Sequence, residues 1–229
     1  SFAESLVKAR SSGYFPVICD MKRRSPQEGD LMGSISPSDL AVALVEAGAP
    51  ALSVVTEPRY FGGSPLLLET VARAVNVPVL CKDFVNSVEQ LRIFREAGAN
   101  AILLIAAHLP IDRLVLLHKE AHNLGLETVV EVHSSEELRQ VASLDLDCLG
   151  INNRDIRQLE LDAGTVANTE SLATLAPVGA VIISESGIQS PGDVRRAAKA
   201  GATAVLVGTA ILKAADPVAY WRSLARALK

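Results

Sequence analysis

The chain has 229 residues, of which 49% are hydrophobic and only 4% aromatic, and its net charge at pH 7 is −4. An acidic chain without a basic block does not match nucleic-acid-binding proteins, so we expect no nucleic-acid partner. No apolar run reaches the roughly 18 residues of a membrane-spanning helix, and the first ten residues show no signal-peptide pattern, so we expect no membrane partner and a cytoplasmic location.

Eight short apolar runs alternate with helix-like segments along the whole sequence. The runs are 16–21, 51–55, 77–81, 101–107, 126–132, 148–151, 180–184 and 204–207. Runs rich in Val, Leu and Ile are typical of buried parallel strands. Because no Pro-, Gly- or Ser-rich linker divides the sequence, we expect one domain over residues 1–229.

Most of the intervening segments begin with a helix-start signal. A small polar residue, often followed by proline at the first helical position, caps a helix N-terminus. These openings are Ser36-Pro37, Ser64-Pro65, Ser87 with Gln90, Ser135, Ser190-Pro191 and Asp216-Pro217. Two further helices are expected over 111–123 and 163–175. An Ala-Gly-Ala phrase around Gly48, Gly98 and Gly201 precedes a strand each time, as expected where glycine ends a helix.

Strands that alternate with helices indicate a parallel sheet, and eight such units in a chain of this length favour a closed barrel. A doubly wound open sheet is the alternative, and it predicts a Gly-rich phosphate-binding turn after the first strand. Residues 22–26 read Lys-Arg-Arg-Ser-Pro there instead. The sequence therefore predicts an α/β fold of the (β/α)8 TIM barrel type.

Charged residues stand at the ends of the first, third and fifth expected strands, where the active site of such a barrel lies. Asp20 and Lys22 are two residues apart and therefore share one face of a strand. Lys82 ends the third strand. Glu131 lies within an apolar run and needs a partner, for which these lysines are candidates. The alternatives are a solvated charge run at the first strand and a structural pair of Lys82 with Asp83.

The last three strands end in polar and glycine-rich segments. Asn152 and Arg154, at the end of the sixth strand, are two residues apart and therefore point to the same side. An arginine there indicates recognition of a carboxylate, and a network that fixes the loop is the alternative. Gly187 and Gly208 follow the seventh and eighth strands, whose loops form the phosphate site of many such barrels. Glycine lets the backbone approach a phosphate closely, and two ordinary turns are the alternative.

No metal or cofactor motif is visible. The four histidines show no ligand spacing with cysteines or acids, and no dinucleotide-binding or P-loop motif is present. The three cysteines, Cys19, Cys81 and Cys148, lie in or beside apolar runs, and we expect buried, unpaired thiols. We therefore expect neither a cofactor nor a bound metal.

Motifs along nearly the whole chain resemble the indole-3-glycerol phosphate synthase family. They lie at 20–26, 53–57, 61–64, 78–84, 130–133, 150–155 and 184–188. The resemblance implies ring closure, decarboxylation and dehydration of 1-(2-carboxyphenylamino)-1-deoxyribulose 5-phosphate, without a cofactor. It also implies a small phosphorylated aromatic substrate as the ligand, other enzymes of tryptophan biosynthesis as candidate partners, and a monomer.

The same resemblance implies roles for individual residues. Lys82 matches the general acid of ring closure, Glu131 the carboxylate beside it, and Lys22 a lysine of the dehydration half. The implied catalytic set is Lys82, Glu131, Lys22, Asp20, Asn152 and Ser186. The implied substrate- and phosphate-binding set is Ser25, Arg154, Glu185, Gly187, Gly208 and Thr209. The implied apolar wall is Phe61, Phe84, Leu103 and Leu206.

The sequence departs from the family pattern at three places. The first catalytic carboxylate of the family is Glu, whereas this chain has Asp20, which is shorter by one methylene. The usual Ser-Lys-Gly of the following loop reads Gln27-Glu28-Gly29. Few residues precede the first strand, so we expect a shortened N-terminal extension and either a more open site or one that a partner or a loop covers. The alternatives are a diverged paralogue for a related phosphorylated substrate and a non-catalytic phosphometabolite-binding barrel.

Overall fold

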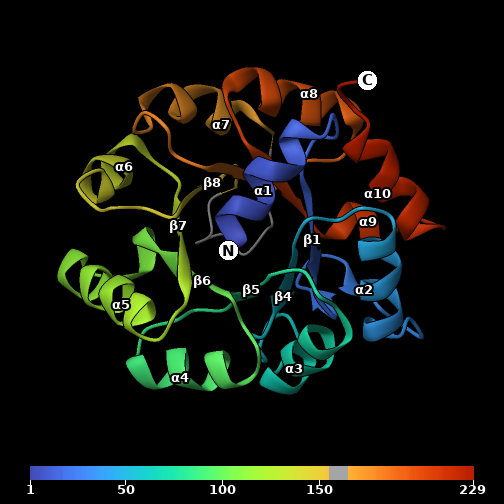
Figure 1. Cartoon of the computed structure of the whole chain (residues 1–229), viewed down its shortest axis with the longest axis horizontal. Helices are drawn as coiled ribbons and strands as arrows, with labels where there is room; N and C mark the ends of the chain where they lie inside the picture. The colour runs from blue at the N-terminus through green and yellow to red at the C-terminus, as the bar shows by residue number, and fades with distance from the viewer. Residues whose placement is uncertain (155–164) are drawn as a thin grey trace.

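The computed structural model describes residues 1–154 and 165–229, and their eight long strands form a closed parallel barrel (Figure 1). The strands follow the order β1-β10-β9-β8-β7-β6-β5-β4 around the barrel. They are β1 (Val17–Met21), β4 (Leu52–Val55), β5 (Val79–Lys82), β6 (Ala101–Ile105), β7 (Glu127–Val132), β8 (Cys148–Asn152), β9 (Ile182–Glu185) and β10 (Ala204–Val207). The eight predicted strands and the (β/α)8 fold are therefore confirmed.

Helices surround the barrel on the outside (Figure 1). They are α2 (Pro37–Glu46), α3 (Pro65–Ala74), α4 (Val88–Glu96), α5 (Ile111–Asn123), α6 (Ser135–Val141), α7 (Ala167–Leu172), α8 (Pro191–Ala200), α9 (Thr209–Leu212) and α10 (Pro217–Ala225). The predicted caps Ser36, Ser64, Ser87, Ser190 and Asp216 all accept a backbone N–H. No described helix is both long and apolar enough to cross a membrane.

Four local details differ from the sequence expectation. Ser134 rather than Ser135 caps α6, because its hydroxyl accepts the N–H of Glu137. The helix expected over 163–175 is α7 followed by the 3-10 turn η3 (Ala173–Leu175), and residues 155–164 lie outside the described part of the chain. A second short turn, η1 (Ala106–His108), ends the fourth apolar run. A small antiparallel hairpin, β2 (Arg24–Ser25) with β3 (Gly29–Asp30), follows β1.

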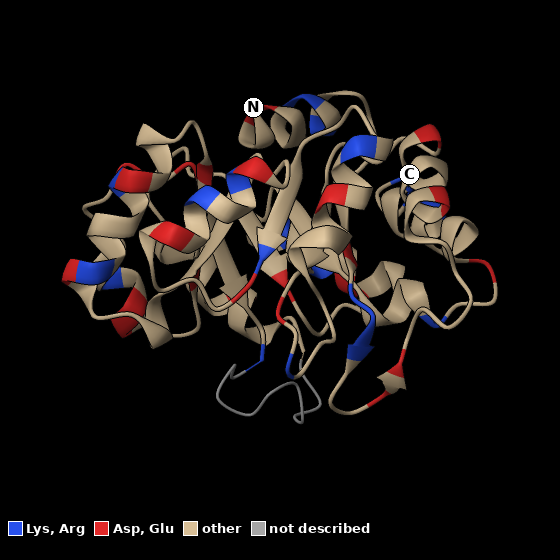
Figure 2. Ribbon diagram, turned by 90° about the horizontal axis from the view of Figure 1, so that it is seen from below, with Lys and Arg blue, Asp and Glu red and all other residues tan. Residues whose placement is uncertain are grey.

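The N-terminal helix α1 (Phe2–Ser11) covers one end of the barrel (Figures 1 and 2). Its start is held by Glu127 of β7, whose carboxylate accepts the backbone N–H groups of Phe2 and Ala3. Phe2 and Leu6 are fully buried among the side chains that fill the barrel interior, such as Leu80. The sequence analysis did not predict this helix. It closes the end where the strands begin.

The apolar residues form two packed groups. One fills the barrel interior and includes Ile18, Leu103 and Leu206, and the other lies between the strands and the outer helices. The three cysteines are buried and unpaired, as predicted. Because the open end of the barrel is the end where the strands finish, polar side chains from several strand ends meet there.

Candidate active site

Lys82, the last residue of β5, forms the centre of a charge cluster at the open end of the barrel. Its ammonium lies 2.9 Å from a carboxylate oxygen of Glu185 and 3.4 Å from one of Glu131. Burial alone would lower the pKa of Lys82, but the carboxylates of Glu185, Glu131 and Asp20 outweigh it and raise the pKa above its ordinary value. Lys82 is therefore held as an ammonium in a confined space.

Glu185, the last residue of β9, is a fully buried carboxylate. Burial raises its pKa to about 7, against the opposing attraction of Lys82. One of its oxygens, Oε1, makes no hydrogen bond with the described residues. A Cβ at Gly150 of β8 would lie only 2.3 Å from that oxygen, so only glycine leaves room for the carboxylate.

Glu131 of β7 is fixed from its other side by the end of β8. The side-chain amide of Asn152 donates to Glu131 Oε1 at 3.1 Å, and its carbonyl accepts the backbone N–H of Arg154 at 3.0 Å. His133 contacts the backbone carbonyl of Asn152 at 3.0 Å, which fits a spacer role. One amide thereby orients both the carboxylate behind Lys82 and the start of the next loop.

The end of β1 brings Asp20 and Lys22 to the same cavity, as their shared parity predicts. Both are almost fully buried. The hydroxyl of Ser53, the register neighbour of Asp20 on β4, donates to Asp20 at 2.7 Å. The ammonium of Lys22 lies 5.7 Å from the ring centre of Phe61, within the range of a cation–π contact.

The ends of β9 and β10 expose backbone to the cavity. Ser186 has φ of 63° and Gly187 φ of 70°, so two consecutive residues adopt the left-handed conformation. For serine this conformation is uncommon, which indicates that the surrounding structure imposes it. A Cβ at Gly208 would lie 2.9 Å from the backbone oxygen of Asp20, so glycine permits this close approach. The short helix α9 starts directly after Gly208.

These strand ends surround a cavity of about 880 Å³. Fourteen of the sixteen predicted site residues line it: Asp20, Lys22, Ser25, Phe61, Lys82, Phe84, Leu103, Asn152, Arg154, Ser186, Gly187, Leu206, Gly208 and Thr209. The other two, Glu131 and Glu185, are not part of the lining but form ion pairs with Lys82, which is. Glu185, which was grouped with the substrate and phosphate contacts, is thus a partner of Lys82 in this structure.

Several residues that position the site were not found from the sequence. The Asn153 amide nitrogen donates to Ser184 Oγ and to the backbone oxygens of Glu185 and Ser186, at 2.9 to 3.0 Å. Glu57 accepts three successive backbone N–H groups that end at Phe61. An Asn beside a strand end and an acid before a turn are common without such roles, so only the fold identifies them.

The rim of the cavity carries an ion pair at a position where the sequence departs from the family pattern. The carboxylate of Glu28, in the β2–β3 hairpin, lies 2.6 Å from the ammonium of Lys213, which directly follows α9. Both side chains are partly exposed, and both line the cavity. The hairpin is thereby fastened to the segment after β10.

Comparison with known proteins gives one consistent family. The family model described as "Indole-3-glycerol phosphate synthase" matches residues 1–224. The chain is 44% identical over 208 residues to the indole-3-glycerol phosphate synthase of Thermococcus kodakarensis, covering 91% of each protein. It is 42% identical to that of Pyrococcus furiosus, covering 88% of each, and 41% identical to that of Halalkalibacterium halodurans, covering 88% of this chain and 77% of that protein.

Solved structures confirm the fold at lower sequence identity. A 3-hexulose-6-phosphate synthase from Salmonella typhimurium superposes with a TM-score of 0.74 at 17% identity, covering 93% of this chain and 98% of that one. A tryptophan synthase alpha chain from Legionella pneumophila superposes with a TM-score of 0.68 at 17% identity, covering 99% and 96%. These similarities concern the arrangement of strands and helices alone.

Proposed function

The chain belongs to the indole-3-glycerol phosphate synthase family, a family of decarboxylating lyases in tryptophan biosynthesis, and we propose how its side chains carry out the family reaction. That reaction closes the pyrrole ring of 1-(2-carboxyphenylamino)-1-deoxyribulose 5-phosphate and releases CO2 and water. The observation that carries our assignment is the ammonium of Lys82. It lies at the cavity wall and is held by two carboxylates behind it.

Lys82 is the general acid of ring closure. When the aromatic carbon attacks the ketone carbon, the carbonyl oxygen gains negative charge, and a fixed ammonium beside it lowers the barrier. Its raised pKa keeps Lys82 protonated until that oxygen becomes an alkoxide, which is basic enough to take the proton. Loss of CO2 then restores the aromatic ring, and the former carbonyl oxygen remains as a hydroxyl.

Dehydration needs a second proton donor for the leaving hydroxyl and a base for the ring proton. Lys22 is our proposed proton donor and Asp20 the proposed base, whereas Glu131 stays paired with Lys82. Asp20 lies in β1 and Lys22 directly follows that strand, and both face one cavity, which supports their joint action. The hydroxyl of Ser53 lies 2.7 Å from one oxygen of Asp20 and thereby fixes the position of this carboxylate.

The rest of the cavity orients the substrate. Asn152 and Ser186 contact the sugar portion, and Arg154 binds the carboxylate of the aromatic ring. The phosphate lies against Ser25, Gly187, Gly208 and Thr209, where exposed backbone and the start of α9 offer N–H groups. The aromatic ring packs against Phe61, Phe84, Leu103 and Leu206.

The decisive experiment is incubation with the carboxyphenylamino substrate while indole fluorescence is recorded. We expect turnover, and we expect Asp20→Asn to lower kcat about 100-fold because a positioned acid or base contributes 10²- to 10⁴-fold. Asp20→Glu restores the residue of the family pattern and tests whether this chain has diverged from the family activity. A large rise in its kcat identifies this chain as a diverged form of the family enzyme. Tight binding of a product analogue without turnover would instead assign a non-catalytic binding protein.

We further propose that the protein works as a monomer in the cytoplasm. The three cysteines are buried and unpaired, which fits a reducing compartment.

A further inference from the structure

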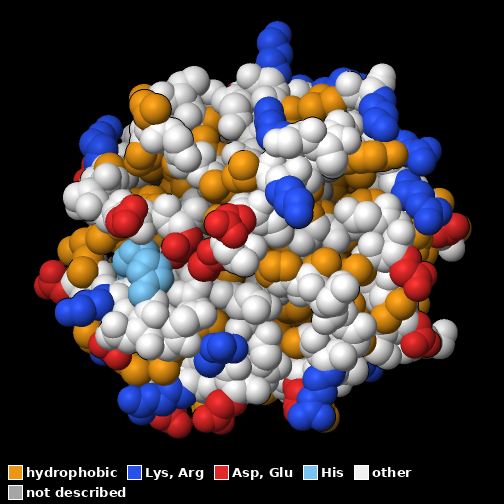
Figure 3. All heavy atoms as spheres, viewed as in Figure 1, with side chains coloured by type: hydrophobic (Ala, Val, Ile, Leu, Met, Phe, Trp, Pro, Cys, Tyr) orange, Lys and Arg blue, Asp and Glu red, His pale blue; other side chains and the backbone are white. Residues whose placement is uncertain are grey.

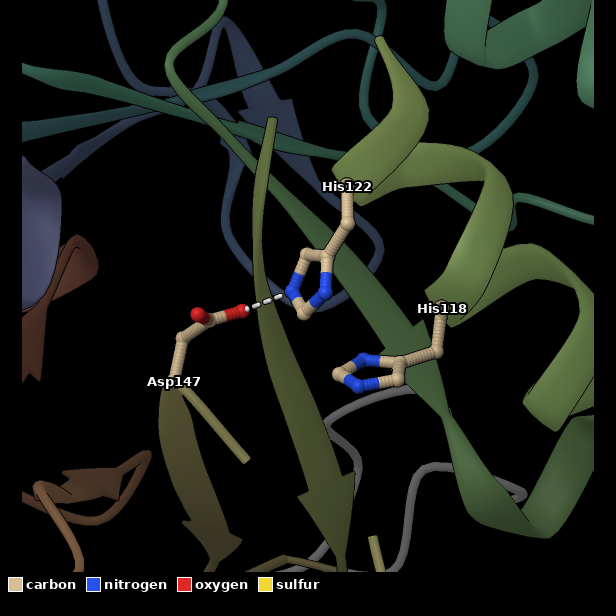
Figure 4. Close-up of side chains that lie close together, drawn as sticks. All are labelled: His118, His122 and Asp147. Atoms are coloured by element: carbon tan, nitrogen blue, oxygen red, sulfur yellow. Dashed lines mark hydrogen bonds and ion pairs between the residues drawn. The ribbon is translucent and has the colours of Figure 1, made fainter. Parts of the chain in front are cut away.

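Two histidines and an aspartate meet on the outer wall of the barrel, away from the catalytic cavity (Figure 4). His118 and His122 are four residues apart on α5, and Asp147 directly precedes β8. One potential ligand atom from each of the three lies within 4.8 Å of the others. Figure 3 shows histidine at the surface with acidic side chains nearby. His122 is partly exposed, whereas His118 is buried.

Existing contacts already fix the three side chains. His122 Nε2 lies 2.7 Å from Asp147 Oδ2, and the two imidazole rings are 4.3 Å apart between centres. The buried hydroxyl of Thr128, on β7, lies 2.8 Å from His118 Nδ1 and 3.1 Å from Asp147 Oδ2. The backbone N–H of Thr128 also donates to Asp147 at 2.8 Å. Thr128 thus orients two of the three groups, as outer residues do around metal ligands.

The chemistry of these groups is that of a transition-metal ligand set. Two imidazoles and one carboxylate bind Zn²⁺ with a water in the fourth position. Metal–ligand bonds of about 2.0 to 2.2 Å place the ligand atoms of a tetrahedral site roughly 3.4 Å apart. Side-chain shifts of about 1 Å would therefore bring the three groups into that geometry.

We propose that His118, His122 and Asp147 bind one divalent transition-metal ion, with Zn²⁺ as the preferred test ion. The ion would join α5 to the residue directly before β8, where the strands begin. Because the catalytic residues lie where the strands end, the role of this site is to stabilise the wall of the barrel. The sequence interpretation missed this grouping, since the acid follows the second histidine by 25 residues.

The test is titration of tag-free, chelator-treated protein with Zn²⁺ by calorimetry and with Co²⁺ by visible absorption. We expect one Zn²⁺ per chain and the visible bands of a tetrahedral Co²⁺ complex. At a hundredfold excess of Zn²⁺ over the dissociation constant, Tm should rise by roughly 5 °C or more. The turnover rate should stay unchanged.

His122→Gln is the matched variant, because His122 is partly exposed and its loss leaves the core intact. It should weaken Zn²⁺ binding at least tenfold and abolish the Tm rise, as should Asp147→Asn. His108→Gln, a histidine outside the cluster, should bind as the parent protein does. The proposal is overturned if the parent protein takes up no Zn²⁺, or if both cluster variants bind it with unchanged affinity while their melting curves show an intact fold.

Discussion

The two ends of the barrel are built from the same eight strands, yet they carry opposite chemistry. Where the strands finish, Asp20, Lys22, Glu131 and Glu185 are almost completely buried although all four are ionisable. Where the strands begin, Phe2 and Leu6 of α1 are buried among aliphatic side chains. Buried ionisable groups cost stability even when they are paired, whereas buried apolar groups supply it. The closed end therefore offsets the cost of the reactive end.

The largest effect of any substitution is expected at the open end, where replacing Lys82 should lower kcat. Lys82→Met keeps the length of the side chain but removes the proton donor, so we expect kcat to fall about 10³-fold or more. Binding of a product analogue should remain measurable by fluorescence titration. Lys119→Met, an exposed lysine on α5, serves as the control and should leave kcat unchanged. Equal turnover in the two variants would remove Lys82 from its role.

A change at the closed end should affect stability alone. Phe2→Ala removes a fully buried ring, and we expect a loss of about 3 to 5 kcal/mol in the free energy of unfolding. At 25 °C kcat should change less than about twofold, because no reacting group is near. Chemical denaturation with parallel kinetics measures both. Val7→Ala, on the exposed side of the same helix, should stay within about 0.5 kcal/mol.

The buried acid Glu185 should give the reactive end a pH-dependent stability. Its pKa is raised in the folded protein, from 4.5 to about 7, so protonation favours the folded state. This contribution is fully present below about pH 4.5 and is lost as the pH rises through 7, by about 3 kcal/mol at most. Unfolding curves of Glu185→Gln should lack this decline, whereas those of the exposed Glu96→Gln should retain it. Parallel declines in both variants would contradict the assignment.

The smallest effect is expected at the rim. Glu28→Gln releases Lys213 from its 2.6 Å ion pair and makes the cavity entrance less negative. Since partly exposed pairs contribute about 0 to 1 kcal/mol, KM for the phosphorylated substrate should fall roughly two- to fivefold with kcat unchanged. High salt should remove the difference, because it screens both charges. A higher KM in this variant would show that holding the hairpin matters more than the charge.

Much of the fold and part of the site could be predicted from residue patterns. The apolar runs predicted the ends of the eight strands to within two residues, because buried parallel strands are typically continuous runs of Val, Ile and Leu. Glu131 inside such a run required a partner, and Lys82 is that partner. Glu185 could not be assigned to the same lysine, since 103 residues separate them and only barrel closure brings them together. Helix α1 escaped prediction because its buried face consists of just two side chains.

Helix α1, which covers the start of the strands, also affects how substrate and products enter and leave the barrel. Phe2 and Leu6 fill that end, so we expect the substrate to reach Lys82 from the other end, where the cavity lies. If the phosphate of the product is held at Gly187 and Gly208 as we propose, carbon dioxide and water must leave the cavity past a bound product. Carbon dioxide and water leave either beside the product or after it. Product release then sets a limit on kcat that faster chemical steps do not remove.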